Sequence, residues 1–167
     1  MLSSIARGIA AGAAGITALN AASYIDMTLR GRSASDTPEQ TVERLARTAH
    51  VTVPGDEQAR RNRLTGLGAL LGMITGTAVG AGYGALHGFG WRPPVAVGGL
   101  VATGAAMAAT TGPLAALGVS DPRTWSATDW LSDVLPHLAF GMVTAATFDA
   151  MRPRRRARRR FPVALRC

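Results

Sequence analysis

The sequence predicts an all-α integral membrane protein, a helical bundle of four transmembrane helices with an amphipathic surface helix in the first connector. Three observations support this fold class. The 167-residue chain contains four apolar segments, each long enough to cross a hydrocarbon core about 30 Å thick if helical and, for the shortest, with little tilt. Its apolar content comes mainly from Ala, Gly, Val and Leu, since aromatic residues make up only 5% of the chain. The 18 basic residues are all arginine, and all but Arg7 lie outside these segments.

The first apolar segment, about residues 5 to 28, carries small residues along its length and polar Asn20 and Asp26 toward its end. Asp26 and Arg30 have the i, i+4 spacing of a helical ion pair at the boundary. Because Arg7 precedes a run of small residues, a cleaved signal peptide is the alternative. The positive region is short and no convincing cleavage site follows, so we interpret the segment as the first span.

The connector after this span, residues 30 to 63, predicts a short helix over residues 38 to 49 that lies on the membrane surface. We expect Thr37 as its N-cap, Pro38 at the first helical position and Gln40 in a capping box. Apolar side chains along one side and charged ones elsewhere suit a helix at the interface.

A second helix should begin in the same connector and run on into the next span. Asp56 is placed to cap its start. The basic cluster Arg60, Arg61 and Arg63 is then expected at the level of the lipid headgroups.

The second apolar segment, about residues 64 to 90, has glycine at every fourth position. Glycine costs about 1 kcal/mol relative to alanine in a water-exposed helix, but small residues let two membrane helices approach closely. Each step of four turns the helix by 400°, so six such positions sweep about 200° and indicate two packing neighbours. The glycine ladder consists of Gly68, Gly72, Gly76, Gly80, Gly84 and Gly88.

The third apolar segment, about residues 94 to 118, repeats this spacing through Gly104, Ala108 and Gly112. We expect these three residues to be the intramolecular partner of the glycine ladder, with the first span or another protein as its second neighbour. The linker between the second and third spans is so short that the two must form an antiparallel hairpin. Pro113 is expected to kink or end the regular helix.

The fourth apolar segment, about residues 129 to 151, is the most polar. Three acids and a histidine recur at multiples of four, which places them on one slowly drifting helical ridge. These residues are Asp129, Asp133, His137 and Asp149. Ionisable side chains inside a span are costly and often functional, so Asp133 and His137, with Asn20 of the first span, form a candidate polar path for protons or ions.

A structural interpretation of the same ridge also stays open. Asp129 and the acid one turn later would then occupy an interfacial first turn with Ser126 as N-cap, and Pro136 would mark the start of the true span. Asp149 would pair with the arginine-rich tail, and His137 would hydrogen-bond a neighbouring helix.

Arginine placement also predicts the orientation. Four spans put both termini on one side, so the connector and the tail after Met151 lie on opposite sides. The tail holds no acid and adjoins the last span, so we predict a multi-pass protein of the cytoplasmic membrane with both termini in the cytoplasm. Three spans, with one segment in the interface, are the alternative.

The tail itself predicts contact with anionic lipid headgroups. The residues expected there are Arg154, Arg155, Arg156, Arg158, Arg159 and Arg160. Nucleic acid is the alternative ligand, but without interleaved aromatic residues its binding would be nonspecific, and we do not expect it as a partner.

Motifs for catalysis or for a cofactor are missing from the sequence. The single cysteine is the last residue, Cys167, which excludes an intramolecular disulfide and a thiolate metal cluster. The glycines near Gly80 follow no strand and precede no Gly-Lys-Ser/Thr ending, so nucleotide binding is rejected there. We expect no enzyme, no metal and no cofactor.

The stretches AGAAGITALNAASYIDM, TPEQTVERLA and DWLSDVLPHLAFGMVTAATFDAM resemble a group of small uncharacterised multi-span membrane proteins of high-GC bacteria. The PHLAFG of residues 136 to 141 is also similar to the YagU-like inner-membrane family, a resemblance that implies a link to acid tolerance. The leading hypothesis is a structural or interaction role, as a bundle that associates with itself or with a larger membrane complex. The alternative is a small transporter or channel with a proton-responsive path through Asp133 and His137.

Overall fold

The computed structural model describes residues 1 to 152, and this part of the chain is helical and contains no strand. Four of its helices are long enough and apolar enough to cross a membrane, and a shorter helix lies in the first connector. The all-α prediction is therefore confirmed. The helices are α1 (Leu2–Arg30), α2 (Thr37–Thr48), α3 (Glu57–Gly88), α4 (Val95–Ala116) and α5 (Ala127–Ala150), with a 3-10 turn η1 (Pro122–Thr124) ahead of α5.

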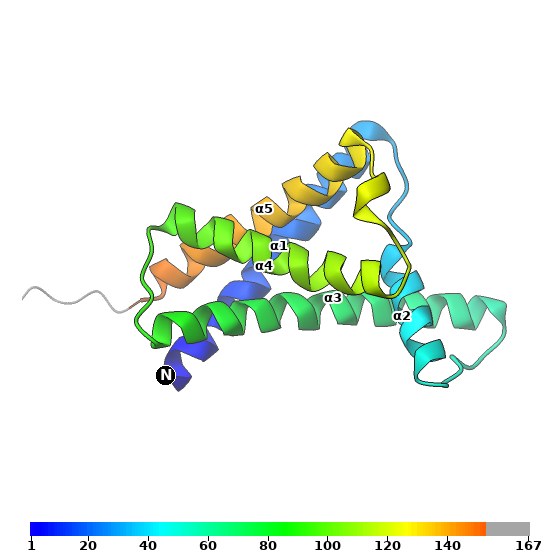
Figure 1. Cartoon of the computed structure of the whole chain (residues 1–167), viewed down its shortest axis with the longest axis horizontal. Helices are drawn as coiled ribbons and strands as arrows, with labels where there is room; N and C mark the ends of the chain where they lie inside the picture. Colours follow the sequence, from blue (N-terminus) through cyan, green and yellow to red (C-terminus); the bar gives the residue numbers. More distant parts are fainter. Residues whose placement is uncertain (153–167) are drawn as a thin grey trace, which may run out of the picture.

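The long helices pack in the order α3 against α1, α1 against α5, and α5 against α4 (Figure 1). α1 crosses α3 obliquely near the start of the chain, and α3 and α4 contact each other much less. Neighbours in sequence run in opposite directions, so the start of α1 and the end of α5 share one end of the bundle. We call this the terminal end, marked by Met1 and Met151, and we call the opposite end, marked by Arg30 and Ser126, the connector end.

Side-chain caps fix the starts of two long helices. The Asp56 carboxylate accepts a hydrogen bond of 2.8 Å from the backbone N–H of Ala59, as predicted for the start of α3. α5 begins with a complete capping box, in which Ser126 and Asp129 each accept a bond from the other's backbone N–H. The box uses the Asp129 carboxylate, so this acid belongs to the helix start and not to a path inside the bundle.

The predicted cap of α2 was wrong by one residue. The N-cap is Asp36, without a side-chain hydrogen bond, and Thr37 is already helical. The Thr37 hydroxyl accepts a hydrogen bond of 2.7 Å from the Ser35 hydroxyl in the preceding loop. The Thr37 oxygen therefore bonds to the preceding loop and does not cap the backbone N–H groups of the first turn.

Both internal prolines lie within helices. Pro113 stands in the last turn of α4, which ends three residues later, in line with the expected helix end. Pro136, which marks the start of the true span in the structural interpretation, lies inside α5, because this helix begins nine residues earlier and continues through it. Proline removes one ladder hydrogen bond at this point, the one to the Ser132 carbonyl.

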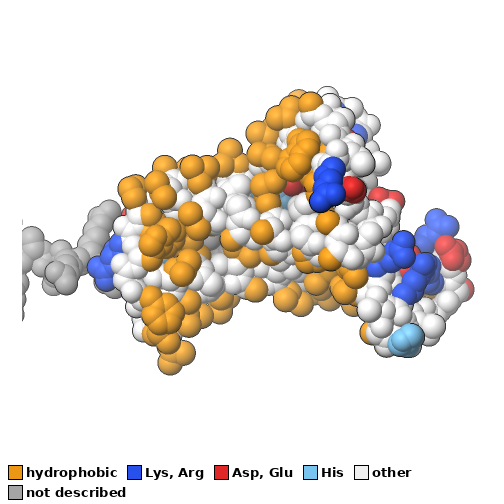
Figure 2. Space-filling model, in the orientation of Figure 1, with side chains coloured by type: hydrophobic (Ala, Val, Ile, Leu, Met, Phe, Trp, Pro, Cys, Tyr) orange, Lys and Arg blue, Asp and Glu red, His pale blue; other side chains and the backbone are white. Residues whose placement is uncertain are grey.

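The packing of the bundle is the reverse of that in a water-soluble helical protein. The buried apolar side chains are mostly alanines together with Leu64, Tyr83, Phe140 and Phe148. Large aliphatic side chains instead face outward, with Ile74 64% exposed and Leu100 60% exposed. Figure 2 shows apolar side chains over the body of the molecule and charged side chains toward its ends. In water such helices would turn their large apolar residues inward.

Candidate functional site

Part of the glycine ladder forms the crossing between α3 and α1. Gly76, Gly80 and Gly84 are buried there, and the facing positions on α1 are Gly8 and Gly12. A Cβ added to Gly8 would lie 2.9 Å from the Gly84 Cα, and backbone carbonyls approach on both sides. The two backbones therefore touch directly, which only glycine permits on both helices.

The rest of the ladder has other surroundings. A Cβ on Gly68 would meet Pro38 of α2 at 2.9 Å, and one on Gly88 would meet the Met1 side chain at 3.2 Å. Gly72 is exposed, with open space where a Cβ would stand. The ladder thus serves two helices, as its 200° sweep indicates, and these are α1 and α2.

The expected partner of the ladder on α4 was wrong. Gly104, Ala108 and Gly112 are all exposed, and a Cβ on either glycine would meet no atom within 4 Å. α4 turns a different set of small residues inward, among them Gly98, Gly99, Ala102, Thr103 and Ala106. Six residues separate Gly98 from Gly104, which is a rotation of about 240° around the helix. One face of α4 therefore packs in the bundle, and the other is left free.

The inward face of α4 packs against α5. A Cβ on Gly141 would lie 2.6 Å from the Thr103 backbone nitrogen, and one on Gly99 would lie 3.2 Å from the Met142 Cα. Farther along α4, toward the connector end, Thr110 lies against His137 of α5. The close glycine contact therefore positions a polar pair between α4 and α5.

His137 and Asp133 form the polar centre of this site. The side chain of His137 is 10% exposed, and its Nδ1 lies 3.4 Å from Asp133 Oδ1 and 2.7 Å from the Asp133 backbone carbonyl oxygen. The other ring nitrogen, Nε2, lies 3.3 Å from the Thr110 hydroxyl. Both nitrogens of the imidazole therefore have polar partners, one on its own helix and one on α4.

These distances define two hydrogen-bond patterns. Nδ1 must carry a proton, because two acceptors do not approach to 2.7 Å. In the neutral ring, Nε2 accepts the Thr110 hydroxyl proton. In the charged ring, Nε2 donates to Thr110, whose hydroxyl then donates to the Ala106 carbonyl 3.0 Å away. Rotation of the Thr110 hydroxyl is therefore the only change needed to pass from one hydrogen-bond pattern to the other.

Asp133 also has an oxygen without a partner. Its Oδ2 is buried and makes no hydrogen bond, and the Thr111 hydroxyl of α4 is unsatisfied in the same way. α4 holds no charged residue, so it can offer Asp133 and His137 only hydroxyl groups. A half-buried carboxylate whose buried oxygen has no partner is the feature here that a structural interpretation leaves unexplained.

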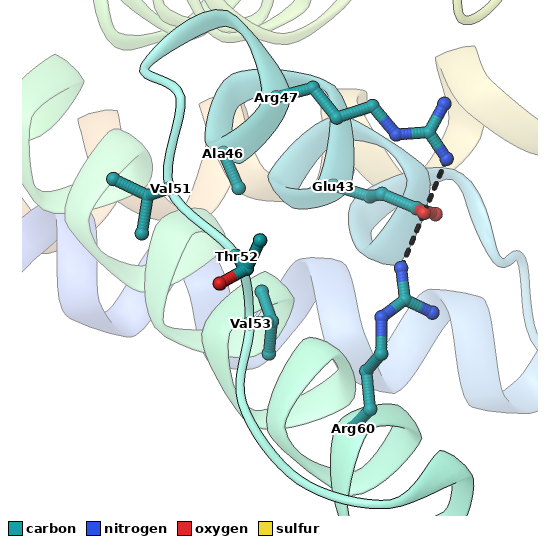
Figure 3. A pocket seen from close by; sticks show the side chains of 7 residues that line it. All are labelled: Glu43, Ala46, Arg47, Val51, Thr52, Val53 and Arg60. Atoms are coloured by element: carbon teal, nitrogen blue, oxygen red, sulfur yellow. Dashed lines mark hydrogen bonds and ion pairs between the residues drawn. The ribbon is translucent and has the colours of Figure 1, made fainter.

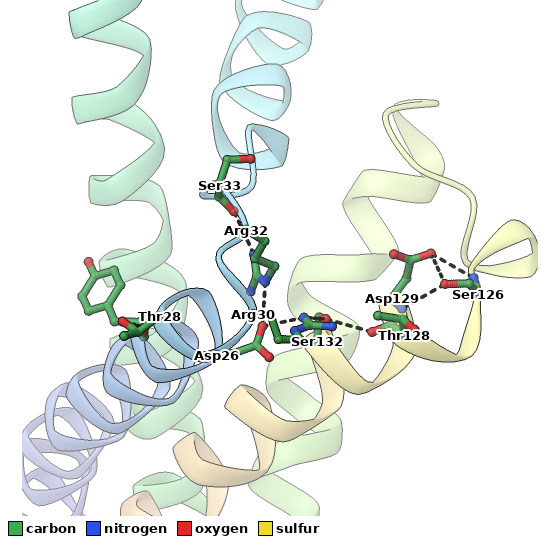
Figure 4. Close-up of polar contacts among 10 residues, drawn as sticks. Asp26, Thr28, Arg30, Arg32, Ser33, Ser126, Thr128, Asp129 and Ser132 are labelled. Atoms are coloured by element: carbon green, nitrogen blue, oxygen red, sulfur yellow. Dashed lines mark hydrogen bonds and ion pairs between the residues drawn. The ribbon is translucent and has the colours of Figure 1, made fainter.

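Arg30 of α1 and Arg32 of the following loop make a group of hydrogen bonds at the connector end (Figure 4). Asp26 accepts hydrogen bonds of 2.6 Å from both Arg30 and Arg32, which includes the predicted i, i+4 pair. Arg30 also donates to the Ser132 hydroxyl of α5, one residue before Asp133. Arg30 thus contacts the residue next to Asp133, but its charge is paired with that of Asp26.

The other predicted site residues lie apart from this centre. Asn20 is half-buried on α1, and no hydrogen bond joins it to Asp133 or His137 within the described chain. Asp149 forms an ion pair of 3.0 Å with Arg152 at the terminal end, as the structural interpretation expected. The arginines from Arg154 to Arg160 lie outside the described residues, so their lipid contact stays a prediction.

Sequence reasoning missed an aromatic cluster at the terminal end. The imidazole of His87 lies between three rings, with centroid distances of 4.5 Å to Tyr83, 4.5 Å to Phe148 and 5.4 Å to Trp91. Tyr83 and Phe148 are almost fully buried. Tyr83, His87 and Trp91 share a spacing of four that could have indicated the cluster, but Phe148 comes from α5 and no local pattern announces it. The cluster ties the end of α3 to the end of α5.

Within residues 1 to 152, no group of three or more His, Cys, Asp or Glu side chains could hold a metal ion. Comparisons of the chain with family models, with curated proteins and with solved structures find no match. The resemblance to the YagU-like family accordingly stays a prediction.

Proposed function

We propose that this chain is an integral protein of a bacterial cytoplasmic membrane, that it crosses the bilayer four times, and that both of its ends lie in the cytoplasm. The outward-facing aliphatic side chains, such as Ile74 and Leu100, support insertion because contact with lipid is favourable for them and contact with water is not. The start of α1 and the end of α5 lie at the same end of the bundle, as four crossings require. The acid-free arginine tail favours the cytoplasm for that end.

Membrane extraction and thiol labelling test this proposal. The protein should stay in the pellet after alkaline carbonate treatment. In intact cells, an impermeant maleimide should label Thr52→Cys in a Cys167→Ser background, while the native Cys167 should react only after permeabilisation. Labelling of both positions from the same side would contradict the four-span topology, and release by carbonate would contradict insertion.

Within the membrane, we assign the chain a structural or interaction role, in which it assembles with itself or with a larger complex. The observation that carries this assignment is the outward face of α4, where Gly104, Ala108 and Gly112 are exposed with no helix against them. Small residues at a lipid-facing surface allow a further helix to approach closely. Beside this face, α3 and α4 leave an apolar groove of 330 Å³ bordered by Gly82, Leu86 and Ala105, among others.

Crosslinking in native membranes, followed by identification of the products, tests the assembly role. Self-association predicts a product at twice the chain mass, and membership of a complex predicts a heterologous partner. A chain that stays monomeric at every crosslinker concentration, with reactive groups placed along α4, would contradict this role.

A proton-dependent transport role is the second candidate function. The buried, unpartnered Oδ2 of Asp133 favours it, together with the position of His137, whose two ring nitrogens both have polar partners. The test is proton or cation flux in proteoliposomes. Flux that does not depend on Asp133 or His137 would contradict it.

A further inference from the structure

A small hollow opens at the connector end between α2 and the first turns of α3 (Figure 3). It has a volume of 210 Å³ and is lined by Glu43, Ala46, Arg47, Val51, Thr52, Val53 and Arg60. α2 contributes one wall, the loop after it a second, and Arg60 of α3 a third. None of the features described so far accounts for this hollow.

Glu43, Arg47 and Arg60 form a charged wall of the hollow, with a net charge of one positive unit. Arg47 and Arg60 each approach the same oxygen of Glu43, Oε1, to 2.5 Å. Hydrogen bonds from Arg47 and Arg60 lower the pKa of Glu43, so the carboxylate stays ionised at neutral pH. No other acid lines the hollow. Each guanidinium has five N–H donors, and the pairing with Glu43 accounts for only one of them.

The opposite wall is mostly apolar, and Thr52 is its one polar residue. Ala46, Val51 and Val53 present their side chains to the hollow, and Val51 is 59% exposed. A solvent-exposed valine beside two arginines makes the hollow amphipathic. Such a surface matches a ligand that joins an anionic group to an apolar one, and not a simple ion alone.

The backbone is shaped to hold this wall in place. α2 ends in a Schellman motif, in which the Val51 N–H donates to the Ala46 carbonyl at 2.8 Å and the His50 N–H donates to the Arg47 carbonyl at 3.0 Å. His50 has a φ of 55°, a left-handed conformation normally taken there by glycine. The motif turns the chain back along α2, so that the loop from Val51 to Val53 faces the two arginines.

We propose that this hollow binds the phosphate group of an anionic membrane phospholipid. The free N–H groups of Arg47 and Arg60 would hold the phosphate, and the apolar wall of Ala46, Val51 and Val53 would contact the adjoining glycerol and upper acyl chain. The inference rests on the membrane insertion proposed above. It adds a defined lipid site on the side of the bundle opposite the arginine tail.

Lipid retention by the full-length protein tests this site. The chain is reconstituted in nanodiscs of phosphatidylcholine and phosphatidylglycerol, released into detergent and weighed by native mass spectrometry. Arg47→Gln with Arg60→Gln should lower the retained phosphatidylglycerol at least threefold, with no change in phosphatidylcholine. Arg44→Gln with Arg61→Gln, which alters the same two helices and the same charge, should retain as much as the unaltered chain. Equal losses in both pairs, or no loss in either, would overturn the proposal.

A second variant separates lipid binding from a purely structural role of the charged wall. Glu43→Gln removes the competing carboxylate and leaves both guanidinium groups, so retained phosphatidylglycerol should rise. If the group of three side chains only joined α2 to α3, this variant would lower retention instead, and that result would overturn the site.

Inorganic phosphate distinguishes the lipid from the free ion. Millimolar phosphate should leave retained phosphatidylglycerol unchanged, because it lacks the apolar part; displacement to the level of the double variant would overturn the assignment to a lipid. Carbonate extraction is run in parallel. Release of every variant from the membrane would contradict the proposed insertion, whereas firm insertion without Arg-dependent retention would contradict only this site.

Discussion

Gly12 of α1 and Gly80 of α3 meet backbone to backbone and leave no space for a side chain on either helix. A Cβ on Gly12 would stand 3.1 Å from the Gly80 Cα, and a Cβ on Gly80 would stand 2.7 Å from the Gly12 Cα. The obstacle in both directions is main chain, which cannot turn aside as a flexible side chain can. The crossing of α1 and α3 is therefore fixed by glycine on both partners.

This contact predicts that Gly80→Ala destabilises the folded chain itself. The added methyl group should force the two backbones apart and lower the free energy of unfolding by about 1 to 3 kcal/mol. Gly72→Ala, on the same ladder but in open space, is the matched control and should cost nothing. Unfolding by sodium dodecyl sulfate, followed by circular dichroism in detergent, measures both. Equal stability of the two variants would contradict the crossing.

The ladder illustrates what the sequence could and could not predict. Its period of four identified a close-packed helix and indicated two neighbours, because that follows from helical geometry alone. Its partners could not be chosen, since the first span and the third span both carry small residues at the same spacing. The choice depends on which face of α4 packs against α5, and that is decided by contacts such as Gly99 against Met142, far apart in sequence.

Gly104→Leu should leave the fold intact and weaken self-association. The position is exposed and a new side chain there meets no atom within 4 Å, so the free energy of unfolding should change by less than about 0.5 kcal/mol. A leucine would nevertheless block close approach of a second helix. The measurement is crosslinking yield in native membranes. The control is Leu100→Ala, one turn earlier on the same exposed face, which removes bulk and should preserve the yield.

Asp133→Asn should abolish any pH-dependent flux that the bundle carries. The amide keeps the shape of the carboxyl group but cannot take up or release a proton beside the His137 ring. Asp129→Asn is the control, because asparagine can also accept the capping bond at the start of α5 and the Asp129 carboxylate is used in that cap. Flux in proteoliposomes across a pH gradient measures the effect. Loss of flux in both variants, or in neither, would argue against the proton-dependent role.

The polar ridge was only partly readable from the sequence. Spacing by four correctly brought Asp133 and His137 together, because side chains at i and i+4 are neighbours on any helix. The same rule placed Asp129 on the ridge, although its carboxylate is used in the capping box. The Thr110 partner could not be predicted, since it depends on how far α4 slides along α5.

His50→Gly should stabilise the end of α2. His50 is the only residue other than glycine with a positive φ in the described chain, and the left-handed conformation costs roughly 1 kcal/mol for a residue with a Cβ. Glycine removes that strain but adds entropy to the unfolded chain, so a net gain of about 0.5 kcal/mol is expected. The reverse change at Gly31, which also has a left-handed φ of 61°, provides the control: Gly31→Ala should be destabilising. Amide hydrogen exchange of residues 45 to 51 reports the local gain.

Acidification should loosen the contact of Glu43 on α2 with Arg60 on α3, while the packing of Pro38 on Gly68 keeps the two helices together. The folded-state pKa of Glu43 is lowered by hydrogen bonds from Arg47 and Arg60, so its contribution to stability is fully present above the unfolded-state pKa. That contribution is lost as the pH falls through the folded-state pKa, which lies below the ordinary value of a glutamate. A fluorophore on Val51→Cys, in a Cys167→Ser background, should therefore report increased mobility below that pKa. In Glu43→Gln the mobility should be raised already at neutral pH and should not change further on acidification, because the titrating group is gone. An acid transition of unchanged size in that variant would show that another carboxylate holds the two helices together.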